Sequence, residues 1–186
     1  MDWRAKYQQA LPYGEFLDRY GTEVHRERWR RVYEAVSLTP QQRALLEGFQ
    51  RDMKLLVLAG TWCGDCVHQC PILQRFAEAT PRIGLRFLDR DEHPDVRELV
   101  SINRGYRIPV VVFLSEDYAE VARYGERTLS LYRQMALDRL GPACPVGVQP
   151  PGEALLRNVI QEWLNEVERV QLLLRLSPRL RALHGD

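Results

Sequence analysis

The sequence has no excess of charge of either sign, because 26 lysines and arginines are matched by 25 aspartates and glutamates. This balance argues against a nucleic-acid-binding protein and against a protein held on an anionic membrane surface. No run of 18 apolar residues occurs, so the sequence predicts no transmembrane helix. The first residues, Met1 to Lys6, lack the apolar segment of a signal peptide, and we therefore expect a cytoplasmic protein.

Cysteines are also few, and the four that are present do not suggest a disulfide framework, since disulfides rarely persist in a reducing compartment. We expect these thiols to be either catalytic or buried. The chain shows no internal repeat and no low-complexity tract, and its hydrophobic content of 45% is ordinary for a protein with a packed core. A length of 186 residues predicts one domain with additions.

Two of the cysteines occur where a strand is expected to end and a helix to begin. An apolar run over 54–60 precedes Cys63, and a helix-like segment over 67–80 follows Cys66. The first turn of a helix presents unpaired N–H groups and a partial positive charge, so we expect Cys63 to be shifted towards the nucleophilic thiolate. Cys66 lies one turn further on and can attack a mixed disulfide formed on Cys63. The spacing therefore predicts an attacking and a resolving cysteine.

Further features follow this motif in order. A proline stands five residues after the second cysteine, a predicted strand ends in an aspartate, and an Ile-Pro pair opens another strand: Pro71, Asp89, Ile108 and Pro109. Together with the Trp-Cys-Gly-x-Cys sequence at 62–66, this order resembles the thioredoxin family over about residues 54–140. The resemblance implies an α/β, thioredoxin-like three-layer fold, with a mixed sheet, helices on both faces, and helical N- and C-terminal extensions.

The resemblance also implies an activity and a site. A thioredoxin-like thiol–disulfide oxidoreductase would use Cys63 as the catalytic nucleophile and Cys66 as the resolving thiol, with no metal and no organic cofactor. Its substrate groove would be lined by residues beside the cysteines and around a cis proline: Trp62, Gly64, Asp65, Ile108, Pro109 and Gly125. The expected partners are a protein or small-molecule disulfide and an external thiol reductant, such as a thioredoxin reductase or a glutathione-type system.

Three positions depart from the family pattern. Val57 stands where the family often carries a buried aspartate that accepts the proton of the resolving thiol. Asp65 places a carboxylate beside the attacking cysteine, and we expect this charge to oppose thiolate formation. Cys70 follows Cys66 by one helical turn. We interpret Cys70 as a small core residue, although a face of three sulfur atoms is geometrically open.

The pattern of breakers and apolar residues divides the chain into four parts. These are a helical N-terminal extension packed on the core (1–52), a thioredoxin-like core (53–141), a Pro/Gly linker that contains Cys144 (142–152) and a C-terminal amphipathic helix (153–186). Apolar residues in the last part form a heptad-like seam: Leu156, Ile160, Trp163, Val167, Val170 and Leu174. This seam predicts packing on the same chain or, alternatively, a homodimer through the helix.

Periodicity and end signals predict the individual elements. We expect strands over 54–59, 85–89, 109–114 and 119–124, and helices over 15–20, 22–36, 67–80, 94–101, 128–140 and 153–176, with a further helix that starts at Thr39.

Two other functions are compatible with the same residues. The first is a metal or iron–sulfur protein that uses Cys63, Cys66 and Cys70, with Cys144 as a candidate fourth ligand, although a second Cys-x-x-Cys pair is missing. The second is a redox-sensing interaction module, in which the helical extensions bind a partner and the cysteines only report the redox state.

Overall fold

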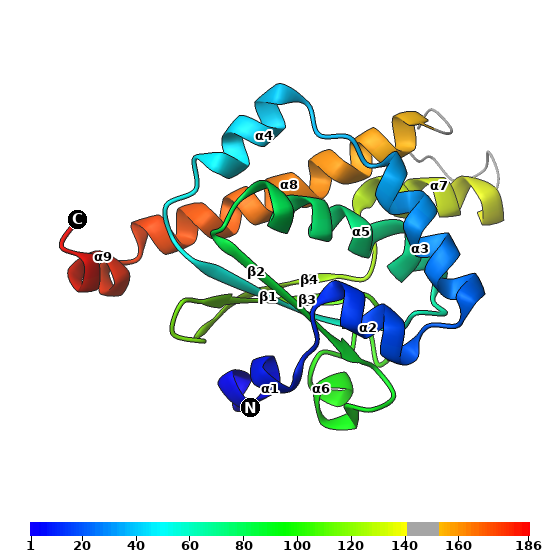
Figure 1. Ribbon diagram of the computed structural model, residues 1–186, viewed down its shortest axis with the longest axis horizontal. Coiled ribbons are helices and arrows are strands. Elements are labelled where there is room, and N and C mark those ends of the chain that lie inside the picture. Colours follow the sequence, from blue (N-terminus) through cyan, green and yellow to red (C-terminus); the bar gives the residue numbers. More distant parts are fainter. Residues whose placement is uncertain (141–152) are drawn as a thin grey trace.

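The structure of the chain is a computed structural model, which describes residues 1–140 and 153–186 (Figure 1). Its centre is a four-stranded sheet in the order β2-β1-β3-β4. β1 pairs with β2 in parallel, whereas β3 is antiparallel to both β1 and β4. The mixed sheet expected from the sequence is therefore confirmed. The strands are β1 (Met53–Ala59), β2 (Ile83–Asp89), β3 (Val110–Ser115) and β4 (Glu120–Gly125).

The two central strands are apolar along almost their whole length because both of their faces are covered. Figure 1 shows α3, α5 and α8 on one side of the sheet and α1 and α6 on the other. These helices are α1 (Trp3–Gln9), α3 (Glu23–Ala35), α5 (Gly64–Ala79), α6 (Pro94–Leu99) and α8 (Glu153–Leu176). The edge strand β4 instead exposes the charged residues Glu120 and Arg123, as is common at the edge of a sheet.

The helix starts predicted near the N-terminus are confirmed. Thr22 caps α3 and Thr39 caps α4 (Pro40–Glu47), each with a reciprocal capping box, and Pro40 occupies the first turn of α4. The other predicted helices correspond to α2 (Tyr13–Tyr20), α6 and α7 (Leu129–Leu140). Two short helices were not predicted, namely α1 and α9 (Pro178–His184). α9 does carry a capping signal, because Ser177 caps it and Pro178 begins it.

The heptad-like seam of α8 packs on its own chain. Five of its six residues are buried, and only the first, Leu156, is partly accessible: Ile160, Trp163, Val167, Val170 and Leu174 form the buried part. A homodimer through α8 therefore stays a prediction. Its interface would have to consist of side chains outside the seam. The predicted linker, with Cys144, lies outside the described residues, and the four-part division of the chain also stays a prediction. None of the helices in the described ranges is long and apolar enough to cross a membrane.

The N-terminal helices hold the turn that follows β1. Trp29 of α3 is fully buried, and its indole N–H donates a hydrogen bond of 2.8 Å to the carbonyl oxygen of Thr61. The hydroxyl of Thr61 donates in turn to the carbonyl oxygen of Tyr20, at the end of α2, at 2.9 Å. Buried polar groups of this kind are costly to leave without a partner. The helices before β1 therefore fix the backbone directly before Cys63.

Replacing Trp29 by Phe keeps an aromatic ring but removes the hydrogen bond to Thr61. We expect the free energy of unfolding to fall by about 2 kcal/mol, because a buried carbonyl loses its partner and a small cavity forms. Urea unfolding followed by tryptophan fluorescence and circular dichroism measures this change. Val24→Ala, at a position of the same helix that is 65% exposed, is the matched control and should change stability by less than about 0.5 kcal/mol. Equal stability of both variants would contradict the anchoring role.

Candidate functional site

Cys63 lies in the turn between β1 and α5. It is the residue that directly precedes α5 and has an extended backbone. Its sulfur is partly exposed, and its thiol donates a hydrogen bond of 3.6 Å to the carbonyl oxygen of Ile108. Cys66 lies in the first turn of α5 and is fully buried. Cys63, Cys66 and Cys70 are free thiols. The structure therefore has one accessible thiol above a buried one.

The predicted groove residues beside the cysteines come together in space. The peptide bond between Ile108 and Pro109 is cis, as the family resemblance implies, and Ile108 is the hydrogen-bond partner of Cys63. Gly125, at the end of β4, approaches Pro109 so closely that a Cβ at this position would collide with the carbonyl oxygen of Pro109. Only glycine therefore fits here. The two loops and the helix start form one surface around Cys63.

Trp62 lies open to solvent next to this surface. Its side chain is 45% exposed, and the guanidinium of Arg90 lies over its ring at 4.6 Å from the ring centre. A Cβ on Gly60 would come within 3.0 Å of the Trp62 ring and 3.1 Å of Ile108, so the glycine allows both side chains to approach the end of β1. The exposed indole therefore presents an apolar surface directly before Cys63.

The pKa values of the two cysteines differ from the sequence-based expectation. The pKa of Cys63 is raised above its ordinary value, first by the hydrogen bond that it shares with the Cys66 thiol and then by burial. Backbone N–H groups of Cys66 and Asp65 lower this pKa, but by less. Burial also raises the pKa of Cys66, although the bond to Cys63 acts in the opposite direction. The expected shift of Cys63 towards thiolate is therefore wrong for the reduced pair.

Asp65 is not the bare negative charge that the sequence suggested. Its two carboxylate oxygens accept hydrogen bonds from Nε and Nη2 of Arg127, at 2.8 and 2.5 Å. Both side chains are largely shielded from solvent, and Asp65 is not among the charges that raise the pKa of Cys63. The ion pair thus neutralises this carboxylate. Gly64, the neighbouring groove candidate, is exposed, and a Cβ there would meet no atom within 4 Å.

A valine and a third thiol are fully buried near the dithiol in the sequence. Val57 is fully buried at the position where the family often carries an aspartate. Cys70 is also fully buried, and it contributes to the raised pKa of Cys66 after burial itself. In the described ranges 1–140 and 153–186, no group of three or more His, Cys, Asp or Glu side chains is placed to hold a metal ion. The metal-binding alternative through Cys63, Cys66 and Cys70 is therefore not supported.

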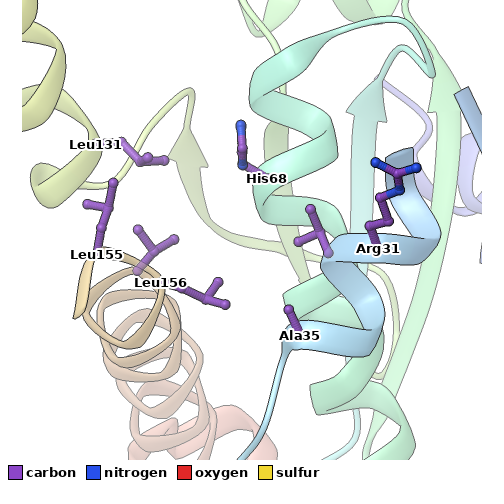
Figure 2. A pocket seen from close by; sticks show the side chains of 8 residues that line it. Arg31, Ala35, His68, Leu131, Leu155 and Leu156 are labelled. Atoms are coloured by element: carbon purple, nitrogen blue, oxygen red, sulfur yellow. The ribbon is translucent and has the colours of Figure 1, made fainter. Parts of the chain in front are cut away.

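An apolar pocket of about 280 Å³ lies on another side of α5. Figure 2 shows His68 of α5 facing it across from leucines of α7 and α8, with Arg31 and Ala35 of α3 on the opposite wall. None of the predicted site residues lines this pocket. His68 therefore belongs to a different surface from the dithiol.

Three residues of the site were missed in the sequence. Arg127 pairs with Asp65, Glu126 is buried beside it, and Gln69 donates a hydrogen bond of 2.7 Å to the carbonyl oxygen of Glu126. The oxygen of the Gln69 side chain accepts a hydrogen bond of 3.0 Å from Trp163 of α8. The only local signal was a pair of opposite charges directly after Gly125. The partners themselves lie more than 50 residues apart in the chain.

The sequence model of the thioredoxin family matches residues 11–138. A crystal structure of a protein of unknown function from Pseudomonas aeruginosa is 20% identical and covers 91% of this chain and 97% of that chain, with a TM-score of 0.70. An HIV epitope scaffold is 19% identical, covers 90% and 99% of the two chains, and has a TM-score of 0.66. Both likenesses concern the fold. No curated protein matches the chain.

The raised pKa of Cys63 predicts how its reactivity depends on pH. A thiol whose pKa lies above its ordinary value is neutral at pH 7, so the thiolate becomes populated only as the pH rises. The rate of alkylation of Cys63 by iodoacetamide should increase about tenfold per pH unit from pH 7 to 9 and show no plateau in this range. In Cys66→Ala, which lacks the shared hydrogen bond, the profile should move to lower pH. A plateau below pH 7 in the wild-type protein would contradict the assignment.

Proposed function

Because the chain belongs to the thioredoxin family, we propose that it is a thiol–disulfide oxidoreductase in which Cys63 attacks and Cys66 resolves. One observation carries this proposal: the partly exposed sulfur of Cys63 lies at the start of α5 against the carbonyl oxygen of Ile108, and Cys66 lies buried behind it. A substrate sulfur can reach the thiol of Cys63, whereas the buried thiol of Cys66 can react only with Cys63. This order of access is what a two-step exchange requires.

The exchange proceeds through two bond changes. The Cys63 thiolate attacks one sulfur of a substrate disulfide, a new bond forms between this sulfur and Cys63, and the other substrate sulfur leaves and takes up a proton. Cys66 then loses its proton and attacks the sulfur of Cys63. The mixed disulfide breaks, the second substrate thiol leaves protonated, and a Cys63–Cys66 disulfide remains. The substrate gains two electrons and the protein loses them.

The surroundings of the pair determine which ionisation steps are favourable. The N–H groups of Asp65 and Cys66 lower the pKa of Cys63, so they stabilise the attacking thiolate once it has formed. The resolving step is less assisted, because burial raises the pKa of Cys66 and Val57 replaces the proton acceptor of the family. We therefore expect turnover to increase with pH above neutrality.

The residues around Cys63 suit an extended disulfide substrate. The carbonyl oxygen of Ile108 lies at Cys63, and the exposed ring of Trp62, the residue before Cys63, offers apolar contact surface. A protein or a small-molecule disulfide is thus the substrate that we propose. The oxidised protein then needs an external thiol reductant, such as a thioredoxin reductase or a glutathione-type system. We place this cycle in the cytoplasm, where such reductants keep thiols reduced.

Single cysteine variants test the assigned roles. Cys63→Ser should reduce the rate of insulin disulfide reduction at least about 100-fold, because the nucleophile is lost. Cys66→Ser should also stop turnover, but it should accumulate a mixed disulfide between Cys63 and the substrate. Mass spectrometry of acid-quenched reactions detects this adduct.

Cys70→Ala is the matched control, since it removes a buried thiol of the same helix that does not face the groove. It should keep most of the insulin reductase activity. Disulfide formation in the wild-type protein without catalytic turnover would instead favour the redox-sensing interaction module. Full activity in Cys63→Ser would rule out the proposed nucleophile.

A further inference from the structure

Four charged side chains of alternating sign form a connected chain beside the first turn of α5. Arg127 binds both carboxylate oxygens of Asp65, and its Nη1 lies 2.9 Å from Oε1 of Glu126. The same glutamate oxygen accepts hydrogen bonds from Arg107 at 2.8 Å and from the hydroxyl of Tyr132 at 2.9 Å. Two acids and two bases alternate along this path, so their formal charges cancel.

This network connects the three segments that surround Cys63. Asp65 belongs to the start of α5, and Arg107 directly precedes Ile108, whose carbonyl oxygen contacts the Cys63 thiol. Glu126 and Arg127 follow Gly125, which packs on Pro109. The network thus links the dithiol to both loops of the proposed groove.

The position of Arg127 is fixed from several sides. The Glu126 side chain that it contacts is only 4% exposed, and Arg127 itself is 16% exposed. Gln69 of α5 holds the carbonyl oxygen of Glu126, and the Tyr132 hydroxyl of α7 donates to its carboxylate. Interactions in such a shielded site are screened by salt much less than surface ion pairs. Arg127 is therefore a fixed partner for Asp65.

The pairing of Asp65 with Arg127 matters for the Cys63 sulfur because Asp65 is its neighbour in the same turn. Asp65 lies two residues after Cys63, in the first turn of α5, and its carboxylate is held by Arg127. A carboxylate in the first turn of a helix readily accepts hydrogen bonds from the free N–H groups there. Without Arg127, the carboxylate would be free to bind these N–H groups and would add an unpaired negative charge beside the Cys63 thiolate.

We propose that Arg127 is a positioning residue for the dithiol: it holds the Asp65 carboxylate as an ion pair at the start of α5, so that no unpaired negative charge lies beside the Cys63 sulfur. Its consequence for turnover rests on the proposed function. The reactivity of Cys63 itself can be measured without any disulfide substrate.

A double-mutant cycle in the full-length, reduced protein tests this role. The readout is the rate of alkylation of Cys63 by iodoacetamide at pH 8, followed by peptide mass spectrometry. Arg127→Ala should lower this rate about tenfold, which corresponds to about one unit of pKa. Asp65→Asn should raise it, because the arginine charge then acts on the thiolate alone. The double variant should be faster than Arg127→Ala, since the harmful carboxylate is gone.

The alkylation rate of the double variant, compared with that of Arg127→Ala, separates a charge effect from a packing effect. A merely structural arginine would make the double variant as slow as Arg127→Ala or slower, and that result, or an unchanged rate in Arg127→Ala, would overturn the proposal. Arg169→Ala is the matched control, because it removes an arginine from an Arg–Glu pair at the surface of α8 and should not change the rate. If Arg127→Ala does not fold, Asp65→Asn decides, and an unchanged or lower rate there would overturn the proposal.

The same set of variants distinguishes the two proposals. A slow Cys63 in Arg127→Ala, combined with no insulin reduction by the wild-type protein, would support the positioning role and reject the oxidoreductase. Normal insulin reduction by the wild-type protein, combined with an unchanged alkylation rate of Cys63 in Arg127→Ala, would support the oxidoreductase and reject the positioning role.

Discussion

The hydrogen bond from the buried indole of Trp29 to the carbonyl oxygen of Thr61 is the constraint on which the site depends. β1 is an interior strand that ends at Ala59, and a turn at the end of a strand can continue in many directions. The hydrogen bond from Trp29 and the hydrogen bond from the Thr61 hydroxyl to Tyr20 fix the direction of the backbone at Thr61. Cys63 then follows at the start of α5, where its sulfur meets Ile108. The N-terminal helices are thus part of the support of the reactive turn.

A second constraint follows from the depth of the pair. Cys63 is partly accessible, whereas Cys66 and the neighbouring Cys70 are fully buried in an apolar core that includes Val57. The hydrogen bond shared with Cys66, followed by burial, raises the pKa of Cys63, and burial raises the pKa of Cys66. At neutral pH, Cys63 and Cys66 of the reduced protein are therefore mainly neutral thiols. The helix end then acts on the small thiolate population, where its N–H groups lower the free energy of the ion.

Much of the fold was predictable because its signals are local. Thr22 and Thr39 cap helices through contacts within four residues, and β1 is an apolar run that only a covered strand can bury. The motif also indicated Cys63, Cys66 and, through the family resemblance, the cis Pro109. What the sequence could not show are contacts between distant segments. The helix-end argument treated Cys63 as an isolated thiol, yet Cys66 and burial dominate its pKa, and Arg127 reaches Asp65 across 62 residues.

The network of four charged side chains around the turn also determines how much the proposed oxidation would change the charge near Cys63. Asp65, Arg127, Glu126 and Arg107 already cancel one another, and the reduced thiols are mainly neutral, as a Cys63–Cys66 disulfide would be. Oxidation therefore changes the net charge of the site very little. It does remove the hydrogen bond that the Cys63 thiol donates to Ile108, because the disulfide has no proton to give. In the proposed Cys63–Cys66 disulfide form, the carbonyl oxygen of Ile108 would lose this donor, so the two forms would differ in hydrogen bonding rather than in charge.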